Sequence, residues 1–335
     1  MNSRWLTPDS AAPCPLSVVV PVFDEEAVLP AFHRRLTDAI ASLGHVVEVV
    51  YVDDGSQDRS RELLQQLHVA DPSVSVVRLS RNFGKEAALT AGLEVARGDC
   101  VVLMDADLQH PPESIPAMLE AWHQGADVVN MRRRSREDET WVKRTAAHAF
   151  YRVLNRLSDI PIPQDVGDFR LLSRRAVDAL TLLQERNRFM KGLFAWIGYR
   201  QVTLEFDCGE RAGGQSKWRY RQLWHFAVEG ITAFSVAPLR FASHVGLVSA
   251  LVAFGYALYF LFKTLVLGDT VPGFPTLIVV VLMLGGLQLL AIGVLGEYLG
   301  RLATESKRRP LYLIDEYAPA STVATTHALP SAGRR

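Results

Sequence analysis

The sequence predicts an α/β domain built on a parallel sheet, followed by a hairpin of two membrane-spanning helices. Two observations lead to this prediction. Short apolar runs alternate with amphipathic segments over residues 17–131, as in parallel sheets covered by helices on both faces. Two later stretches, residues 241–262 and 270–296, contain no Asp, Glu, Lys or Arg. Each is long enough to cross a bilayer, for which a helix needs about 20 apolar residues.

The expected strands and helices follow one another in regular alternation. Strands are predicted where Val, Ile and Leu are concentrated, at 17–22, 46–52, 74–79, 100–104 and 127–131. Helices are predicted in the amphipathic segments between them, at 26–42, 59–69, 85–96 and 113–123. Ligands of such sheets bind at the carboxyl ends of the strands.

Polar clusters stand at the ends of four predicted strands. They are Phe23 to Glu26, Asp53 to Ser56, Arg81 to Lys85 and Asp105 to Asp107. A carboxylate after a strand is often only a helix cap or a turn residue. Because parallel strands end at one edge of the sheet, the four clusters should converge there and form a binding site.

Asp105 and Asp107 indicate a metal site at this edge. Residues i and i+2 of an extended segment point the same way, with Cα atoms about 6.5–7 Å apart. Two carboxylates so placed can close on one divalent cation, and Gln109 is near enough to support the second carboxylate or a bound water. Mg²⁺ typically takes one or two protein carboxylates and fills its shell with water and phosphate oxygens. The pattern therefore predicts Mg²⁺ or Mn²⁺ together with a diphosphate-bearing donor.

Composition and missing motifs exclude several other classes. Lys and Arg number 36, as do Asp and Glu, so no net charge attracts nucleic acid. The three cysteines are far apart and no Cys-x-x-Cys spacing occurs, which argues against a disulfide framework or a zinc site. The sequence contains no Walker loop and no Gly-x-Gly-x-x-Gly, so kinase and dinucleotide sites would lack their phosphate cradle.

An ordered set of motifs resembles the family 2 glycosyltransferases. The motifs are Pro-Val-Phe-Asp-Glu-Glu at 21–26, Val-Asp-Asp-Gly-Ser at 52–56, Asp-Ala-Asp-Leu-Gln-His-Pro-Pro-Glu at 105–113, Gly-Asp-Phe-Arg-Leu at 167–171 and Arg-Ala-Gly-Gly-Gln-Ser-Lys-Trp at 211–218. More closely, the chain resembles polyisoprenyl-phosphate glycosyltransferases related to dolichol-phosphate-mannose synthase, over about residues 15–310. The resemblance implies a GT-A-type, Rossmann-like nucleotide-sugar-binding domain plus a two-helix transmembrane hairpin. Asp24 is a departure, because the family often has Asn there.

The resemblance also implies a role for each candidate residue. The nucleotide-sugar would contact Asp24, Glu26, Asp53, Lys85 and Asp105. The metal would be held by Asp105, Asp107 and Gln109. The acceptor phosphate would lie near Arg211, Ser216 and Lys217. Asp168 matches the position proposed as catalytic base.

The role of Asp168 has alternatives on chemical grounds. A lipid monophosphate is anionic near pH 7, since its second pKa is about 6, and its oxygen is already a nucleophile. A strong general base is then less necessary than for a hydroxyl acceptor. Asp168 could orient the acceptor, or steady an oxocarbenium-like sugar, as much as take a proton. It could also merely cap the turn before a predicted strand at 169–172.

The expected domain organisation has five parts. They are an N-terminal tail (1–14), a catalytic domain (15–215), an interfacial amphipathic segment (216–240), two transmembrane helices within 241–300 (about 241–266 and 274–300), and a partly disordered C-terminal tail (301–335). Basic residues flank both spans on the outer sides, so both termini and the catalytic domain should face the cytoplasm. A pair of buried core helices is the alternative to membrane spans.

The expected function is inverting transfer of a sugar from a nucleotide-sugar, UDP-linked by analogy, to undecaprenyl phosphate or a similar polyisoprenyl phosphate. The site would lie on the cytoplasmic face of the cell inner membrane, in contact with the lipid bilayer. Glycines in the second span predict a homo-oligomer, with a tetramer as one expected form. Two alternatives are a processive polysaccharide synthase, for which the Gln-x-x-Arg-Trp signature is lacking, and a non-catalytic membrane scaffold.

Overall fold

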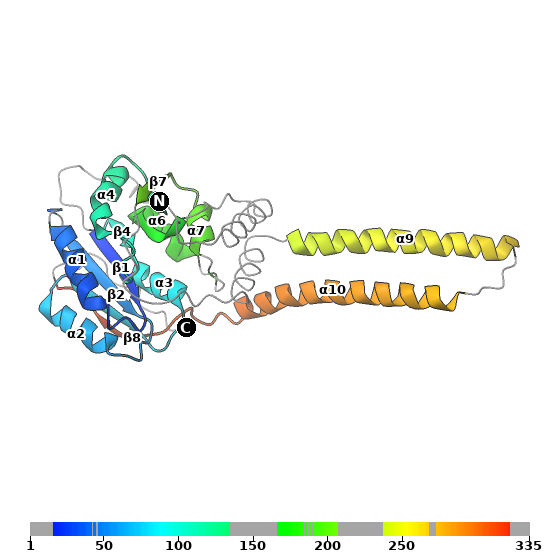
Figure 1. Ribbon diagram of the computed structural model, residues 1–335, viewed down its shortest axis with the longest axis horizontal. Coiled ribbons are helices and arrows are strands. Elements are labelled where there is room, and N and C mark those ends of the chain that lie inside the picture. The colour runs from blue at the N-terminus through cyan, green and yellow to red at the C-terminus, as the bar shows by residue number, and fades with distance from the viewer. Residues whose placement is uncertain are drawn as a thin grey trace. The chain divides into compact units, whose positions relative to one another are not determined.

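The computed structural model describes residues 16–41, 43–44, 46–134, 166–183, 185, 188, 190–206, 237–267 and 273–321. The chain divides into two compact units (Figure 1). The first unit comprises Met1–Tyr151, Ile160–Arg219 and Pro310–Arg335. The second comprises Arg152–Asp159 and Tyr220–Arg309.

The first unit is built on an eight-stranded sheet with the order β7-β5-β6-β4-β1-β2-β3-β8. Its strands are β1 (Leu16–Val22), β2 (Val47–Asp53), β3 (Val74–Leu79), β4 (Cys100–Leu103), β5 (Val128–Arg133), β6 (Val166–Ser173), β7 (Gln201–Phe206) and β8 (Ile314–Ala318). The pairings β4-β1-β2-β3 and β5-β7 are parallel. The five strands predicted over residues 17–131 all run in one direction, as expected, but the whole sheet is mixed. Strand β6 runs antiparallel to β4 and β5, and β8 runs antiparallel to β3.

Helices cover both faces of this sheet (Figure 1). They are α1 (Leu29–Ala41), α2 (Ser60–Ala70), α3 (Lys85–Val95), a 3₁₀ turn η1 (Pro112–Ser114) leading into α4 (Ile115–His123), α6 (Arg174–Leu182) and α7 (Met190–Trp196). Buried side chains of α1, α2 and α4 share one core with the strands. On the opposite face α3 lies so close to the sheet that a Cβ on Gly92 would stand 2.2 Å from Val19 Cγ1. The five strands and four helices predicted over residues 17–131 are confirmed, with ends shifted by up to three residues.

A buried carboxylate organises the end of the sheet where β1, β2 and β3 begin. Glu48 is 1% exposed and accepts hydrogen bonds from Ser17 Oγ (2.8 Å) and Ser75 Oγ (2.9 Å). Arg97 donates to the same carboxylate from its backbone N (3.0 Å), Nε (3.0 Å) and Nη2 (2.8 Å). A buried charge needs this many hydrogen bonds, because the free-energy cost of its desolvation otherwise exceeds its attraction to the partner charge.

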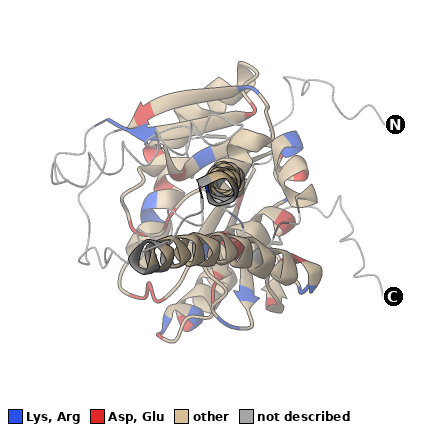
Figure 2. Ribbon diagram, turned by 90° about the vertical axis from the view of Figure 1, so that its right-hand side faces the viewer, with Lys and Arg blue, Asp and Glu red and all other residues tan. Residues whose placement is uncertain are grey.

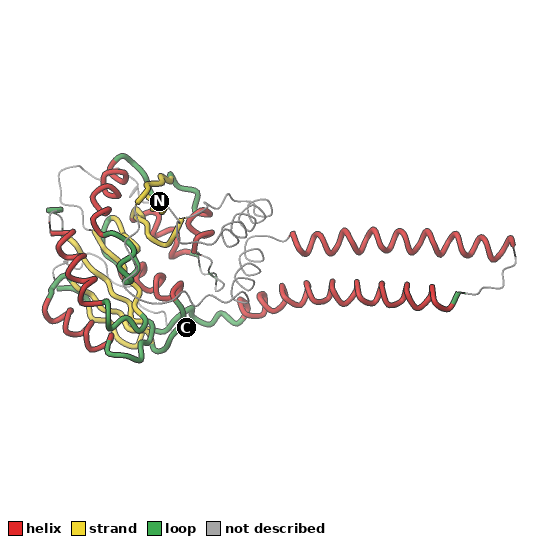
Figure 3. Tube along the Cα trace, in the orientation of Figure 1, coloured by secondary structure: helices red, strands yellow, loops and turns green. Residues whose placement is uncertain are grey.

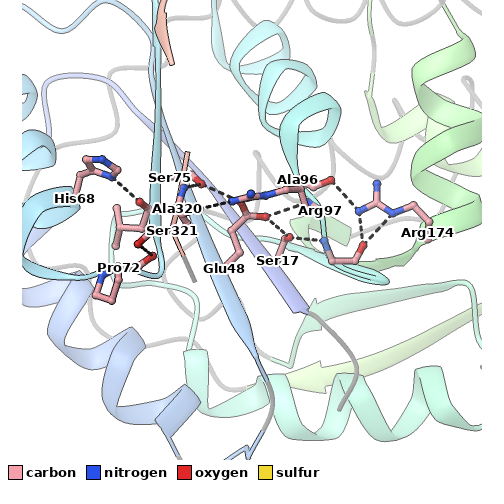
Figure 4. Close-up of polar contacts among 12 residues, drawn as sticks. Ser17, Glu48, His68, Pro72, Ser75, Ala96, Arg97, Arg174, Ala320 and Ser321 are labelled. Atoms are coloured by element: carbon pink, nitrogen blue, oxygen red, sulfur yellow. Dashed lines mark hydrogen bonds and ion pairs between the residues drawn. The ribbon is translucent and has the colours of Figure 1, made fainter. Parts of the chain in front are cut away.

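The same network holds the chain that follows the second unit (Figure 4). Arg97 Nη2 donates to the carbonyl of Ala320 (2.9 Å), and Ala320 N donates to Ser75 Oγ (2.8 Å). Just before this residue, β8 pairs with β3 and extends the sheet by one strand. Strand β8 corrects the prediction of a separate, partly disordered tail over 301–335, of which residues 322–335 lie outside the described part.

The second unit contains two long helices, α9 (Ala237–Leu267) and α10 (Phe274–Ser306), drawn in red in Figure 3. They coincide with the two predicted spans. Large apolar side chains such as Phe254, Met283 and Leu289 are about 70% exposed. Among described residues, Met283–Ser306 is long and apolar enough to cross a membrane by length and composition, and Ala242–Tyr256 is a shorter apolar helix. Lys, Arg, Asp and Glu are by contrast spread over the strands and helices of the first unit (Figure 2).

Replacing Glu48 by Gln tests the buried network. The change leaves the Arg97 guanidinium without its carboxylate, and breaking a buried pair in this way costs about 3–5 kcal/mol. We expect a large fall in the melting temperature of the detergent-solubilised protein.

The matched control is Glu113→Gln. Glu113 pairs with Arg35 at 2.8 Å, but both side chains are well exposed. Exposed pairs contribute only about 0.2–1 kcal/mol, so the control should melt within a few degrees of the parent. Equal melting shifts for the two variants would contradict the importance given to the buried carboxylate.

Candidate active site

The structure brings the described site residues to one rim of the sheet, where the parallel strands end. The loop from β1 to α1 carries Asp24 and Glu26, and the end of β2 carries Asp53. Lys85 is the first residue of α3. The segment after β4 carries Asp105, Asp107 and Gln109.

Asp168 reaches the same rim because β6 runs against its neighbours. Leu103, the last residue of β4, pairs with Arg170 of β6. The first residues of β6 therefore lie beside the last residues of β4. In a parallel arrangement Asp168 would lie at the opposite end of the sheet, so the reversed strand is what places this carboxylate in the site.

One ammonium group joins the two carboxylates. Lys85 Nζ lies 2.7 Å from Asp105 Oδ1 and 2.9 Å from Asp105 Oδ2. It also lies 2.7 Å from Asp168 Oδ2. Burial works against the charged form of the lysine, but the attraction of Asp105 and Asp168 prevails and raises its pKa. The lysine therefore stays protonated between the two acids.

Negative charge nevertheless accumulates around this point. The pKa of Glu25 is raised by burial first and then by the nearby Asp107 and Asp105. The described residues hold no cluster of three or more His, Cys, Asp or Glu side chains arranged to enclose a metal ion. Two carboxylates and one amide suit a hard cation that keeps water and phosphate oxygens in its shell. Asp105 already binds one cationic group, the ammonium of Lys85. The carboxylates and the amide therefore fit Mg²⁺ or Mn²⁺.

The loop after β4 is held in an unusual conformation. Asp107 Oδ1 accepts the backbone N–H of Gln109 (3.1 Å), and the Gln109 amide oxygen accepts a hydrogen bond from Arg133. Leu108 between them has φ +60°, a left-handed conformation that is uncommon for a residue other than glycine. Arg35 holds this loop from outside by binding Glu113 through two hydrogen bonds (2.8 and 2.9 Å).

His110 is a site residue that the sequence analysis missed. Its Nδ1 accepts the backbone N–H of Asp105 (3.1 Å), and its ring stacks on Phe169, with centroids 4.9 Å apart and planes at 13°. The side chain is buried, and burial lowers its pKa, so the ring is neutral and can accept. His110 thus links the backbone of Asp105 to the residue after Asp168. The available signal was its place in the motif at 105–113, in which no role had been assigned to the histidine.

Asp24 and Glu26 connect two loops of the rim. Asp24 Oδ1 accepts the backbone N–H of Gln57 (2.7 Å), and Glu26 Oε2 accepts that of Arg59 (3.0 Å). Asp24 has φ +54°, which Asn and Asp tolerate better than most residues. Both residues are exposed, so they shape the loops beside the site while keeping contact with solvent.

Asp53, predicted to contact the nucleotide-sugar, and its neighbour Asp54 both bind backbone N–H groups of the rim loops. Asp53 is 1% exposed, and its Oδ1 accepts the backbone N–H of Ser56 (2.8 Å). Asp54, which was not singled out, accepts the N–H groups of Phe83 (2.7 Å) and Gly84 (2.9 Å), and burial raises its pKa. Asp54 thereby holds the loop that leads to Lys85. The predicted acceptor residues Arg211, Ser216 and Lys217 lie outside the described part of the chain.

Two substitutions of His110 separate its two contacts. His110→Phe keeps a ring on Phe169 but leaves the Asp105 N–H without an acceptor, which costs about 1–3 kcal/mol. His110→Asn keeps an acceptor and loses the stacking, worth about 0.5–1.5 kcal/mol. We expect the Phe variant to bind Mn²⁺ more weakly than the Asn variant when both are titrated by electron paramagnetic resonance. The reverse order would show that stacking, not the hydrogen bond, positions Asp105.

Comparison with known proteins identifies the family of the chain. The chain matches glycosyl transferase family 2 over residues 17–181 and the GtrB C-terminal hairpin over residues 237–302. It is 46% identical over 301 residues to an uncharacterized glycosyltransferase of Synechocystis sp., covering 90% of this chain and 95% of the relative. It is 44% identical to a prophage bactoprenol glucosyl transferase homolog of Escherichia coli, over 89% of this chain and 98% of the relative. It is 45% identical to the bactoprenol glucosyl transferase of Shigella phage SfV, over 89% and 97%. The chain therefore belongs to glycosyl transferase family 2 and carries the GtrB C-terminal hairpin.

Proposed function

We propose that this protein transfers a sugar from a nucleotide-sugar, a UDP-sugar, to the phosphate of a polyisoprenyl phosphate at the cytoplasmic face of the cell inner membrane. The observation that carries the proposal is the rim of the sheet, where Lys85 joins Asp105 to Asp168. A donor with a diphosphate and an acceptor with a phosphate both need positive charge and a divalent cation at such a place. The relatives named bactoprenol glucosyl transferase support a polyprenyl acceptor.

Asp105, Asp107 and Gln109 would hold the divalent cation. When bound, the cation neutralises charge on the diphosphate leaving group. The ammonium of Lys85 stands beside the same carboxylate and supplies a further positive charge to the diphosphate. Electrostatic stabilisation of a leaving group in this way is worth several kcal/mol in the transition state.

The acceptor needs less help than a sugar hydroxyl. Its phosphate oxygen attacks the anomeric carbon, and the bond from that carbon to the donor diphosphate breaks with inversion. Asp168 would orient the acceptor or the sugar, because an ionised phosphate carries no proton that must be removed at pH 7. Arg211, Ser216 and Lys217 are the residues we assign to the acceptor phosphate.

The apolar helices supply the reason for a lipid acceptor. Large apolar side chains along α9 and α10 are exposed, and a pair of helices this apolar is stable in lipid and insoluble in water. We propose that α9 and α10 both span the inner membrane, with the catalytic domain in the cytoplasm as the flanking basic residues indicate. The glycines of α10 support self-association as a homo-oligomer.

Substitution of the metal carboxylates tests this function. We expect Asp105→Asn and Asp107→Asn each to lower transfer from UDP-glucose to undecaprenyl phosphate about 100-fold or more, because each loses a ligand of the cation that stabilises the leaving group. Removing divalent cations with EDTA should lower the parent equally, and added Mn²⁺ or Mg²⁺ should restore it. Radiolabelled sugar extracted into the lipid phase is the measurement.

The matched control is Asp178→Asn in α6. Its carboxylate is 62% exposed and makes a long ion pair of 3.9 Å with Arg174. This variant should transfer at the parental rate. Full activity of the Asp105 and Asp107 variants would refute the metal site, and a panel of nucleotide-sugars in the same assay identifies the donor.

A further inference from the structure

Lys85 occupies a position that helix stability does not favour. It is the first residue of α3, where the helix dipole and the open N–H groups favour negative charge. The cost is offset by two carboxylates from different strands, one after β4 and one in β6. The contacts with the carboxylates, and not helix stability, therefore account for a lysine at this position. A divalent cation bound to Asp105 would bring positive charge to the same place.

We propose that Lys85 is a displaceable counter-ion of the site: it holds Asp105 and Asp168 together until a divalent cation binds at Asp105, and its ammonium then turns to the diphosphate of the donor. This inference rests on the proposed function, because it requires a diphosphate-bearing donor and a cation. Beyond that function, we infer that the cation and the donor bind cooperatively and that Lys85 causes the cooperativity.

The contacts are suited to such an exchange. The Lys85 side chain is 41% exposed, whereas those of Asp105 and Asp168 are 25% and 17% exposed. The ammonium is therefore open to solvent and to an arriving ligand, although its attraction to the two carboxylates is strong. A lysine ammonium is a compact charge on a flexible four-carbon stem, so it can change partners without moving the backbone. The rigid parts of the site stay in place, since Asp54 holds the loop before Lys85 and His110 holds the backbone of Asp105.

Electrostatics then couples the two ligands. A divalent cation at Asp105 repels an ammonium that lies within 3 Å of the same carboxylate, so the cation alone binds poorly. A diphosphate removes the penalty by accepting the ammonium, so each ligand raises the affinity for the other by the same factor. Asp168 affects cation binding because it shares the Lys85 ammonium with Asp105. Without Asp168, the ammonium would bind Asp105 alone and would be harder for a cation to displace.

The test is a cycle of four full-length proteins in detergent: the parent, Lys85→Met, Asp168→Asn and the double variant. Mn²⁺ affinity is measured by electron paramagnetic resonance, with and without UDP. Without UDP, Lys85→Met should bind Mn²⁺ about tenfold more tightly than the parent, because a repelling charge is gone. The gain in Mn²⁺ affinity caused by UDP should shrink by a similar factor.

The cycle contains its own check on Asp168. Asp168→Asn should weaken Mn²⁺ binding when Lys85 is present and leave it unchanged when Lys85 is Met. Lys85→Gln repeats the test with a polar side chain of similar length. Lys307→Met, which removes an equal charge from an exposed position in the second unit, should bind Mn²⁺ like the parent.

The outcomes separate this inference from the proposed function. If the parent binds Mn²⁺ with UDP and transfers sugar, but Lys85→Met and Lys85→Gln bind Mn²⁺ no more tightly without UDP, the counter-ion role is wrong and the glycosyltransferase stands. If the parent binds no Mn²⁺ even with UDP, the metal site itself is wrong and the inference falls with it. A Lys85 effect that persists unchanged in the Asp168→Asn background would also overturn the sharing of the ammonium.

Discussion

The crowding of acidic groups at one edge of the sheet is the constraint on which the rest of the site depends. Asp105, Asp107 and Asp168 lie there, and the pKa of nearby Glu25 is raised first by burial and then by Asp107 and Asp105. Such a group of like charges is stable only when positive charge is supplied. The protein supplies one ammonium of its own, and the divalent cation that we propose would supply the remaining positive charge. Donor binding and catalysis therefore depend on the same requirement, which is positive charge that compensates the clustered carboxylates.

Strand direction and backbone hydrogen bonds determine where the charged side chains of the site lie. The antiparallel course of β6 delivers Asp168 beside the end of β4. The buried ring of His110 then fixes the spacing between the two strands, because it accepts from the backbone of Asp105 and stacks on Phe169. Asp54 performs a similar task for the loop before Lys85. Each charged side chain is thus positioned by a neutral or buried neighbour that takes no part in the chemistry itself.

Local sequence pattern predicted much of this and missed what depends on distant pairing. Continuous Val runs identified β1 and β2 because both faces of these strands are covered, and the carboxylates after β4 were recognised from their spacing. The direction of β6 has no local signature, since it is set by contacts with β4 and β5. Strand β8 was missed because its sequence, Ile-Asp-Glu-Tyr-Ala, is polar and mostly exposed. The roles of Asp53 and Asp54 could not be separated, because both are buried and only the fold decides which loop each carboxylate binds.

The contact between Ala320 and Ser75 joins residues 245 positions apart. The sheet is therefore assembled from two pieces of chain, and both apolar helices are made between them. During synthesis the unit must wait with β3 uncovered along one side until the hairpin has left the ribosome and the last strand can return. Contacts of such sequence separation form late and slowly, and an unpaired strand edge invites association with other chains. Correct maturation of this enzyme is consequently tied to prompt handling of its apolar helices, because β8 begins only eight residues after α10 ends.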